Sequence, residues 1–149
     1  MGPYGCGKTH LAAAIGHYRE DVGDLPIMVG VPDFLDHLRS TFSPNSAVSL
    51  DQRFEEVRKA PLLILDDLNT HAATPWAKEK LLQLINYRYN AEMPTVITTA
   101  TKLEDMDARI LSRMLDRRLC RIMGITAPTY TGGGAPQETK RTPARSRSK

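Results

Sequence analysis

The first ten residues combine glycines, a lysine and a threonine at a spacing suited to holding phosphate. The order G-x-x-x-x-G-K-T runs directly into a helical pattern, which is the context in which such a loop binds nucleoside triphosphates. Glycines let consecutive backbone N–H groups turn inward around phosphate oxygens at the positive end of the helix. Lys8 would neutralise the β- and γ-phosphates, and the hydroxyl of Thr9 would bind Mg²⁺. The predicted ATP-binding residues are Gly2, Pro3, Tyr4, Gly5, Cys6, Gly7, Lys8, Thr9 and His10.

Two acidic residues elsewhere in the chain would complete this site. Asp66 and Asp67 directly follow four large aliphatic residues, a run typical of a buried parallel strand. Ligands of open α/β sheets gather at the carboxyl ends of such strands. We therefore expect Asp66 to share a hydrated Mg²⁺ with Thr9, and Asp67 to orient or deprotonate an attacking water.

Helices and short apolar strands alternate along the chain, which indicates an α/β fold with a parallel sheet and crossover helices. In the first helix Leu11, Ile15 and Tyr18 share one face, and the neighbouring alanines permit close approach to a sheet. Thr74 and Pro75 provide a cap and a first position for a long helix. We predict helices over residues 8–19, 32–42, 49–59, 75–90 and 105–116, and strands over 25–31, 62–65, 95–99 and 119–125.

Composition and charge divide the chain into one domain and a tail. With 149 residues and 41% hydrophobic content, the length supports a single globular domain, which we place at residues 1–130. Residues 131–149 contain five Lys and Arg against one Glu and have no apolar side chain to bury, so we predict a disordered basic tail. No apolar run approaches the ~20 residues that cross a bilayer, and no signal peptide opens the chain, so a cytoplasmic location is expected.

Four segments resemble the DnaC/IstB-type AAA+ ATPases, a family of helicase loaders and transposition helper proteins. They are GPYGCGKT, LLILDD, TPWAKEKLLQLINYRYN and PTVITTATKLEDMDARILSRMLD, and the resemblance spans about residues 2–130. It implies a three-layer P-loop NTPase fold, with Walker A at the glycine-rich loop and Walker B at Asp66 and Asp67. It also implies ATP and Mg²⁺ as cofactors and a role in DNA replication, through helicase loading, or in transposition.

The same resemblance gives Arg113 the place of the family's arginine finger. Such an arginine reaches the γ-phosphate of a neighbouring subunit, which implies a homo-oligomer in which Arg113 acts in trans. From the residues alone, Arg113 would instead belong to a solvated cationic surface. The implied partners are a replicative helicase or a transposase, with single-stranded DNA as a further ligand. Candidate DNA contacts are Phe34, Arg39, Phe42 and Arg53, with core packing favoured for the two phenylalanines.

The chain departs from the family pattern at three places. Ala100 stands where the family has a sensor asparagine, which leaves Thr99 or Thr101 as substitutes. Tyr130 is followed by threonine where the family usually has arginine. The P-loop begins at residue 2, so we expect the first, central strand to be missing, no helical lid domain, and a chain that is N-terminally incomplete. Competent ATP hydrolysis is therefore left open.

Two alternatives to a loader ATPase follow from the residues. One is an ATP-gated binding module that does not hydrolyse the nucleotide, which Ala100 favours. The other is a small P-loop kinase, for which the arginines between residues 109 and 121 are the only candidate lid. DNA-stimulated hydrolysis would favour the loader, and binding without turnover would favour the module.

Overall fold

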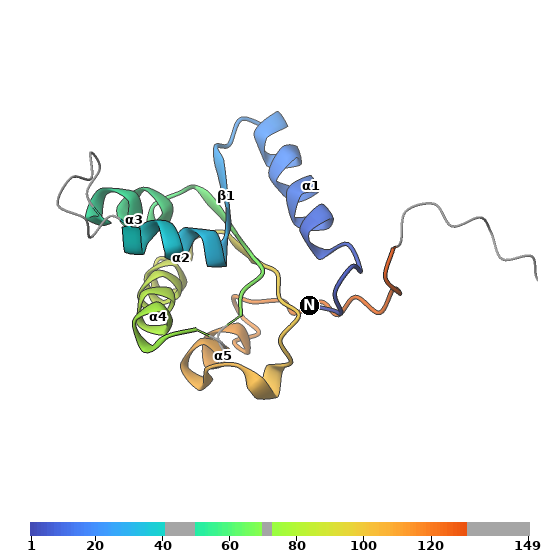
Figure 1. Ribbon diagram of the computed structural model, residues 1–149. Coiled ribbons are helices and arrows are strands. Elements are labelled where there is room, and N and C mark those ends of the chain that lie inside the picture. Colours follow the sequence, from blue (N-terminus) through green and yellow to red (C-terminus); the bar gives the residue numbers. More distant parts are fainter. Residues whose placement is uncertain (41–49, 70–72, 131–149) are drawn as a thin grey trace, which may run out of the picture.

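Three parallel strands form the sheet of this protein, in the order β1-β2-β3. The computed structural model describes residues 1–40, 50–69 and 73–130 (Figure 1). This α/β arrangement agrees with the predicted P-loop fold. The helices are α1 (Lys8–Asp21), α2 (Val31–Ser40), α3 (Leu50–Arg58), α4 (Pro75–Asn90) and α5 (Ala108–Met114), the strands are β1 (Pro26–Gly30), β2 (Leu62–Asp66) and β3 (Thr95–Ile97), and a short 3₁₀ turn, η1, covers Leu103–Asp105.

The central strand β2 sets the geometry of the sheet. It pairs in parallel with β1 on one edge and β3 on the other, so that Ile64 lies between Met28 and Val96. Leu62 to Leu65 are all buried, because helices cover both faces of a parallel sheet. All three strands end at the same edge, and β2 ends there with Asp66.

Helices cover the two faces of the sheet unequally. Figure 1 shows α1 by itself on one side, whereas α2, α3, α4 and α5 gather on the other. The helix α4 begins as predicted, since Thr74 caps it by accepting a hydrogen bond from the N–H of Ala77 at 3.3 Å and Pro75 is its first residue. No helix of the described ranges is long and apolar enough to cross a bilayer.

The prediction that small alanines let α1 approach the sheet is confirmed at Ala12, whereas the face of Leu11, Ile15 and Tyr18 is not buried. Ala12 and Gly16 face the sheet, whereas Leu11, Ile15 and Tyr18 are 54%, 43% and 66% exposed. Small residues let the helix approach β2 closely: a Cβ added to Gly16 would lie 3.0 Å from the side chain of Ile64. The large residues consequently point away from the strands.

The predicted last strand, residues 119–125, does not form. Residues 120–130 follow an irregular path past the start of the chain, where the N–H of Ile125 donates to the Met1 carbonyl at 2.7 Å. Gly2 donates in turn to the Thr99 carbonyl at 3.3 Å. The amino group of Met1 also donates to the Met123 carbonyl at 2.7 Å. These few bonds reach only Met1 and Gly2, and an apolar, β-branched segment becomes a strand only beside a longer partner strand.

The start of α5 and the end of β3 also differ from the prediction. The predicted helix 105–116 is shorter, because η1 precedes it and the Asp107 carboxylate caps α5 by accepting from the Arg109 N–H. Strand β3 ends at Ile97 rather than at Thr99. Residues 41, 42 and 49 of the predicted helices 32–42 and 49–59, and the whole predicted basic tail, lie outside the described residues.

Candidate nucleotide-binding site

The glycine-rich loop wraps around the ammonium group of Lys8. Its Nζ donates hydrogen bonds to the carbonyls of Gly2, at 2.9 Å, and Pro3, at 2.7 Å. Gly7 is the N-cap residue directly before α1. It has a φ of 89°, a left-handed conformation that favours glycine. Nothing lies within 4 Å of the Cβ position of Gly7. This open space beside the first N–H groups of α1 is where a phosphate would approach.

Thr9 and Asp66 meet, although they are 57 positions apart in the sequence. The hydroxyl of Thr9 donates to both carboxylate oxygens of Asp66, at 2.9 Å and 3.1 Å. Asp67 follows with a φ of 57°, which is uncommon for a residue other than glycine. The packing of α1 against β1 and β2 thus joins the phosphate loop to the acidic end of the central strand.

Thr98 links the two acids, and sequence reasoning did not single it out. Its hydroxyl donates to Asp66 Oδ1 at 2.6 Å and accepts from the N–H of Asp67 at 3.0 Å. The next residue, Thr99, is turned the other way and donates to the Leu68 carbonyl at 2.6 Å. Three threonines follow β3. Thr98 hydrogen-bonds to the acids, whereas Thr99 and Thr101 do not.

A cavity of about 410 Å³ opens between the phosphate loop and the ends of the strands. Gly2, Pro3 and Cys6 do not line it: the carbonyls of Gly2 and Pro3 bind Lys8, and Cys6 is buried beneath the loop. Its lining brings together most of the predicted site: Tyr4, Gly5, Gly7, Lys8, Thr9, His10, Asp66, Asp67 and Thr98.

The donors at this cavity fit Mg²⁺ held jointly with phosphates. Among the described residues no group of three or more His, Cys, Asp or Glu side chains could enclose a metal ion. Mg²⁺ usually takes only one or two protein ligands and completes its shell with phosphates and water. The hydroxyl of Thr9 and the carboxylate of Asp66 are a pair of that kind.

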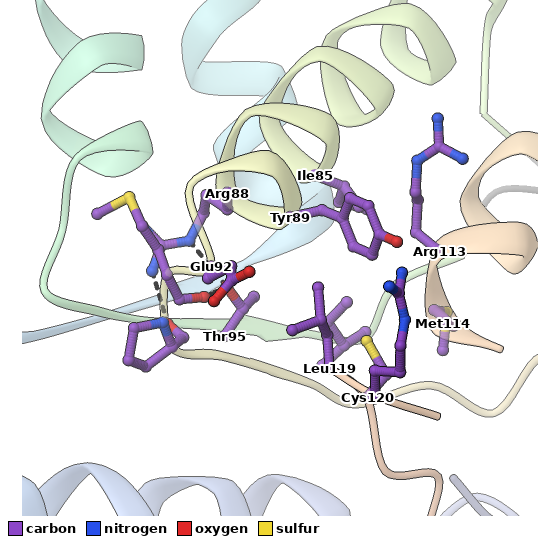
Figure 2. Close-up of a pocket in the computed structure, with 13 residues that line it drawn as sticks. Ile85, Arg88, Tyr89, Glu92, Thr95, Arg113, Met114, Leu119 and Cys120 are labelled. Atoms are coloured by element: carbon purple, nitrogen blue, oxygen red, sulfur yellow. Dashed lines mark hydrogen bonds between the residues drawn. The ribbon is translucent and has the colours of Figure 1, made fainter. Parts of the chain in front are cut away.

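Arg113 lies away from this cavity, on α5. Its Nε donates to Asn86 Oδ1 at 3.2 Å, and its guanidinium lies 5.3 Å from the centre of the Tyr89 ring. Figure 2 shows it at a second cavity, of about 300 Å³, between α4, β3 and the turn after α5. The structure therefore does not bring Arg113 to the phosphate loop of its own chain.

A cluster beside Arg113 holds the end of α5 against α4. The hydroxyl of Tyr89 donates to Asp116 Oδ2 at 2.6 Å, and Arg118 pairs with the same oxygen at 2.8 Å. The bond from Arg118, followed by that from Tyr89, lowers the pKa of Asp116 well below its usual range. The same contact with Asp116 raises the pKa of Tyr89.

Arg88 is a buried cation held by backbone carbonyls and a hydroxyl, and sequence reasoning missed it. It is 1% exposed and donates to the carbonyls of Arg58, Ala60 and Pro94 at 2.9, 2.8 and 2.6 Å, and to Thr95 Oγ1 at 2.9 Å. Figure 2 shows its bonds at the start of β3. Burial lowers its pKa. The sequence did contain a signal for this arginine: at helical spacing, Arg88 lies on the same face of α4 as the buried Leu81, Leu84 and Ile85.

Two of the four candidate DNA contacts, Phe34 and Arg53, line one cavity beside α2 and α3. Phe34 is 7% exposed and belongs to the core, as the favoured alternative predicted. Arg53 pairs with Glu56 on its own helix, and Arg39 lies over the ring of Trp76. Phe42 lies outside the described residues.

Comparison with protein families gives a match along most of the chain. The model of the IstB-like ATP binding proteins matches residues 1–130. The chain belongs to this family. Its members are described as ATP-binding, which agrees with a phosphate loop joined to an acidic strand end.

Curated relatives of this IstB-like protein include two helicase loaders. The replicative helicase loader DnaC of Escherichia coli K12 is 28% identical over 116 residues, which are 78% of this chain and 47% of that protein. The replicative helicase loader DnaI of Bacillus subtilis is 25% identical over 99 residues, 66% of this chain and 31% of that protein. The chain thus spans about half the length of DnaC and about a third of the length of DnaI.

Solved structures share the fold of this IstB-like chain. The DnaC helicase loader superposes with a TM-score of 0.70 at 24% identity, covering 83% of this chain and 75% of that one. DnaI gives 0.68 at 26% identity over 86% and 69%. AMPPCP-bound DnaA from Aquifex aeolicus gives 0.71 at 20% identity over 83% and 38%. The AAA+ P-loop fold expected from the sequence is confirmed.

Proposed function

We propose that this chain binds Mg²⁺-ATP at the phosphate loop and acts as a DnaC/IstB-type AAA+ ATPase that assists another protein on DNA. The observation that carries the proposal is the contact of Thr9 with Asp66. It joins the two halves of a P-loop site from distant parts of the sequence. Membership of the IstB-like ATP binding family supports the choice of nucleotide.

Lys8 would exchange its partners when ATP binds under this proposal. It would leave the carbonyls of Gly2 and Pro3 and donate to phosphate oxygens, where its charge is neutralised by an anion rather than by peptide dipoles. Thr9 would turn a lone pair toward the cation while its proton stays on Asp66. The bound Mg²⁺ would supply charge compensation for the phosphates.

Asp67 and Arg113 are the proposed catalytic residues. Asp67 is exposed at the cavity and directly follows Asp66, the proposed Mg²⁺ ligand. It can therefore accept a proton from a water molecule or orient that water. Arg113 lies on α5, remote from its own phosphate loop, as a residue acting on a neighbouring subunit must. This proposal therefore includes a homo-oligomer.

The proposed partner is a replicative helicase or a transposase, with single-stranded DNA as a further ligand. Support for the helicase comes from the names of the curated relatives, which are replicative helicase loaders. Support for transposition comes from the IstB-like family itself. Both roles use the same ATP site.

Ala100 favours a second candidate, an ATP-gated module that binds without turnover. A methyl group there offers no hydrogen bond to an attacking water. Purified chain that binds ATP yet hydrolyses none, with or without single-stranded DNA, would identify the module. Hydrolysis that single-stranded DNA stimulates would identify the loader.

Calorimetric titration of the full chain with ATP in the presence of Mg²⁺ tests the proposed site. Lys8→Ala should lower the affinity at least tenfold, because it removes the charge that faces the phosphates. Lys59→Ala is the matched control, since Lys59 directly follows α3, does not line the cavity and pairs with Glu55; it should bind like the wild type. Absence of binding by folded wild-type chain, or equal binding by Lys8→Ala, would reject the proposal.

A further inference from the structure

We propose that Thr98 is the positioning residue for both acids of the nucleotide site, and that its hydroxyl couples Mg²⁺ to nucleotide binding. This inference rests on the proposed function. Thr98 is 6% exposed, so its hydroxyl must be satisfied within the protein. One hydroxyl offers one proton and accepts through its lone pairs, and Thr98 uses both capacities on neighbouring residues.

The bond from Thr98 fixes the orientation of the Asp66 carboxylate, the proposed Mg²⁺ ligand. At 2.6 Å the O–H···O contact has the short length of a hydrogen bond to an ionised acceptor. Thr9 donates to the same carboxylate at 2.9 Å and 3.1 Å, but its hydroxyl is also the second cation ligand. The lone pair of Thr9 can face the cation while its proton stays on Asp66. Thr98 is therefore a second donor that holds the carboxylate in place, one that does not itself bind the cation.

The bond from Asp67 fixes the backbone of the second acid. Asp67 has a φ of 57°, a conformation that persists in residues other than glycine only where the surroundings determine it. Its N–H donates to Thr98 Oγ1 at 3.0 Å. The adjacent Leu68 N–H donates to the Thr98 carbonyl at 2.8 Å, so two consecutive amides are tied to one residue of the neighbouring segment.

Thr98 therefore acts through the acids rather than on the nucleotide. Mg²⁺ demands nearly ideal octahedral geometry, so a rotated carboxylate weakens its site. A group that orients a metal ligand typically changes metal affinity ten- to a hundredfold. Binding of the phosphates to the loop of Lys8 does not use Asp66. Loss of the Thr98 hydroxyl should thus affect the Mg²⁺-dependent part of ATP affinity and spare the rest.

The test compares ATP affinity with Mg²⁺ and with EDTA, using the full chain and calorimetry. The measured quantity is the dissociation constant of ATP in EDTA divided by the dissociation constant of ATP with Mg²⁺. In Thr98→Val, which keeps the shape and removes the hydroxyl, this ratio should fall roughly tenfold, while affinity in EDTA stays within about twofold. Thr98→Ala should behave in the same way, and Thr98→Ser, which keeps the hydroxyl, should restore the ratio.

Thr99→Val is the matched control. Thr99 is adjacent and buried, and its hydroxyl is also hydrogen-bonded, but to the Leu68 carbonyl and away from Asp66. Circular dichroism establishes that each variant folds, and Thr98→Ala carries the test if Thr98→Val does not. An unchanged ratio in the folded variants without the hydroxyl, an equal fall in Thr99→Val, or a failure of Thr98→Ser to restore it would overturn the inference alone. Wild-type chain that binds no ATP would overturn the proposed function as well.

Discussion

The two faces of the sheet differ in how much they bury. On the face covered by α2, α3, α4 and α5, sixteen buried residues of the described chain form one cluster. On the face covered by α1, the buried cluster is Ala12, Leu62 and Ile64. Both clusters use alternate residues of β2, so a single strand joins a large core to a thin one (Figure 1).

This difference separates stability from the proposed chemistry. Hydrophobic stabilisation scales with the apolar area removed from water, so most of it lies on the side of α4. Lys8 and Thr9 begin α1, on the thinly covered side. Segments with few buried contacts open more readily than the core. The phosphate loop thus leads into a helix whose buried residues are small.

The same substitution on the two faces should have very different effects. Leu65 is fully buried in the large cluster, and Leu65→Ala should lower the free energy of unfolding by about 3–5 kcal/mol, because it leaves a cavity among side chains that relax only partly. Leu11, on α1, is 54% exposed, and Leu11→Ala should change it by less than about 1 kcal/mol. Urea denaturation followed by circular dichroism measures both.

Similar losses in the two variants would contradict the comparison. A loss of several kcal/mol in Leu11→Ala would mean that the outer face of α1 is covered in solution. Sedimentation of the wild-type chain at several concentrations would then show whether a second copy covers it.

Arg88 should be the most important polar contributor on the large-core side. Arg88→Met keeps the length of the side chain but leaves three buried carbonyls without their donor, so we expect a loss of about 2–4 kcal/mol in the free energy of unfolding. Urea denaturation measures it. The exposed Arg117, changed in the same way, should stay within about 0.5 kcal/mol of the wild type. Equal stability of both variants would show that water satisfies the carbonyls.

Asp116 should contribute a smaller effect, confined to acid. Its pKa is lowered in the folded chain, against about 3.9 when unfolded. The stabilisation is therefore fully present above about pH 4 and is lost as the pH falls toward the folded pKa. Thermal unfolding between about pH 5 and pH 2 should show a shallower decline in Asp116→Asn than in the wild type. Asp105→Asn is the control, and a decline parallel to the wild type in Asp116→Asn would exclude the contact with Arg118 as the cause.

Local signals predicted the elements of the large-core side well. The run from Leu62 to Leu65 predicted a buried strand, and Thr74 with Pro75 predicted the start of α4. These signals act between residues a few positions apart. The phosphate loop was predicted for the same reason, since its glycines, Lys8 and Thr9 are consecutive.

Features that depend on distant partners were not predicted. Residues 119–125 have the composition of a strand but lie beside isolated groups of Met1 rather than beside a strand. The large residues of α1 do not face the sheet, although their spacing suggested a common apolar face, because closeness to β2 selects small residues over large ones. Thr98 and Asp66 are 32 positions apart, and Arg88 reaches carbonyls up to 30 positions away. No pattern within one segment reports such contacts.

Contacts between the two ends of the described chain bear on the order of folding. Thr129 donates to the carbonyl of Tyr4 at 3.0 Å across 125 positions, and the N–H of Tyr130 donates to the carbonyl of Gly5 at 3.0 Å. Closing so large a loop costs entropy that only a nearly complete structure offsets, and such contacts form slowly. We therefore expect the phosphate loop to take its final shape late, after α4 and the sheet have assembled.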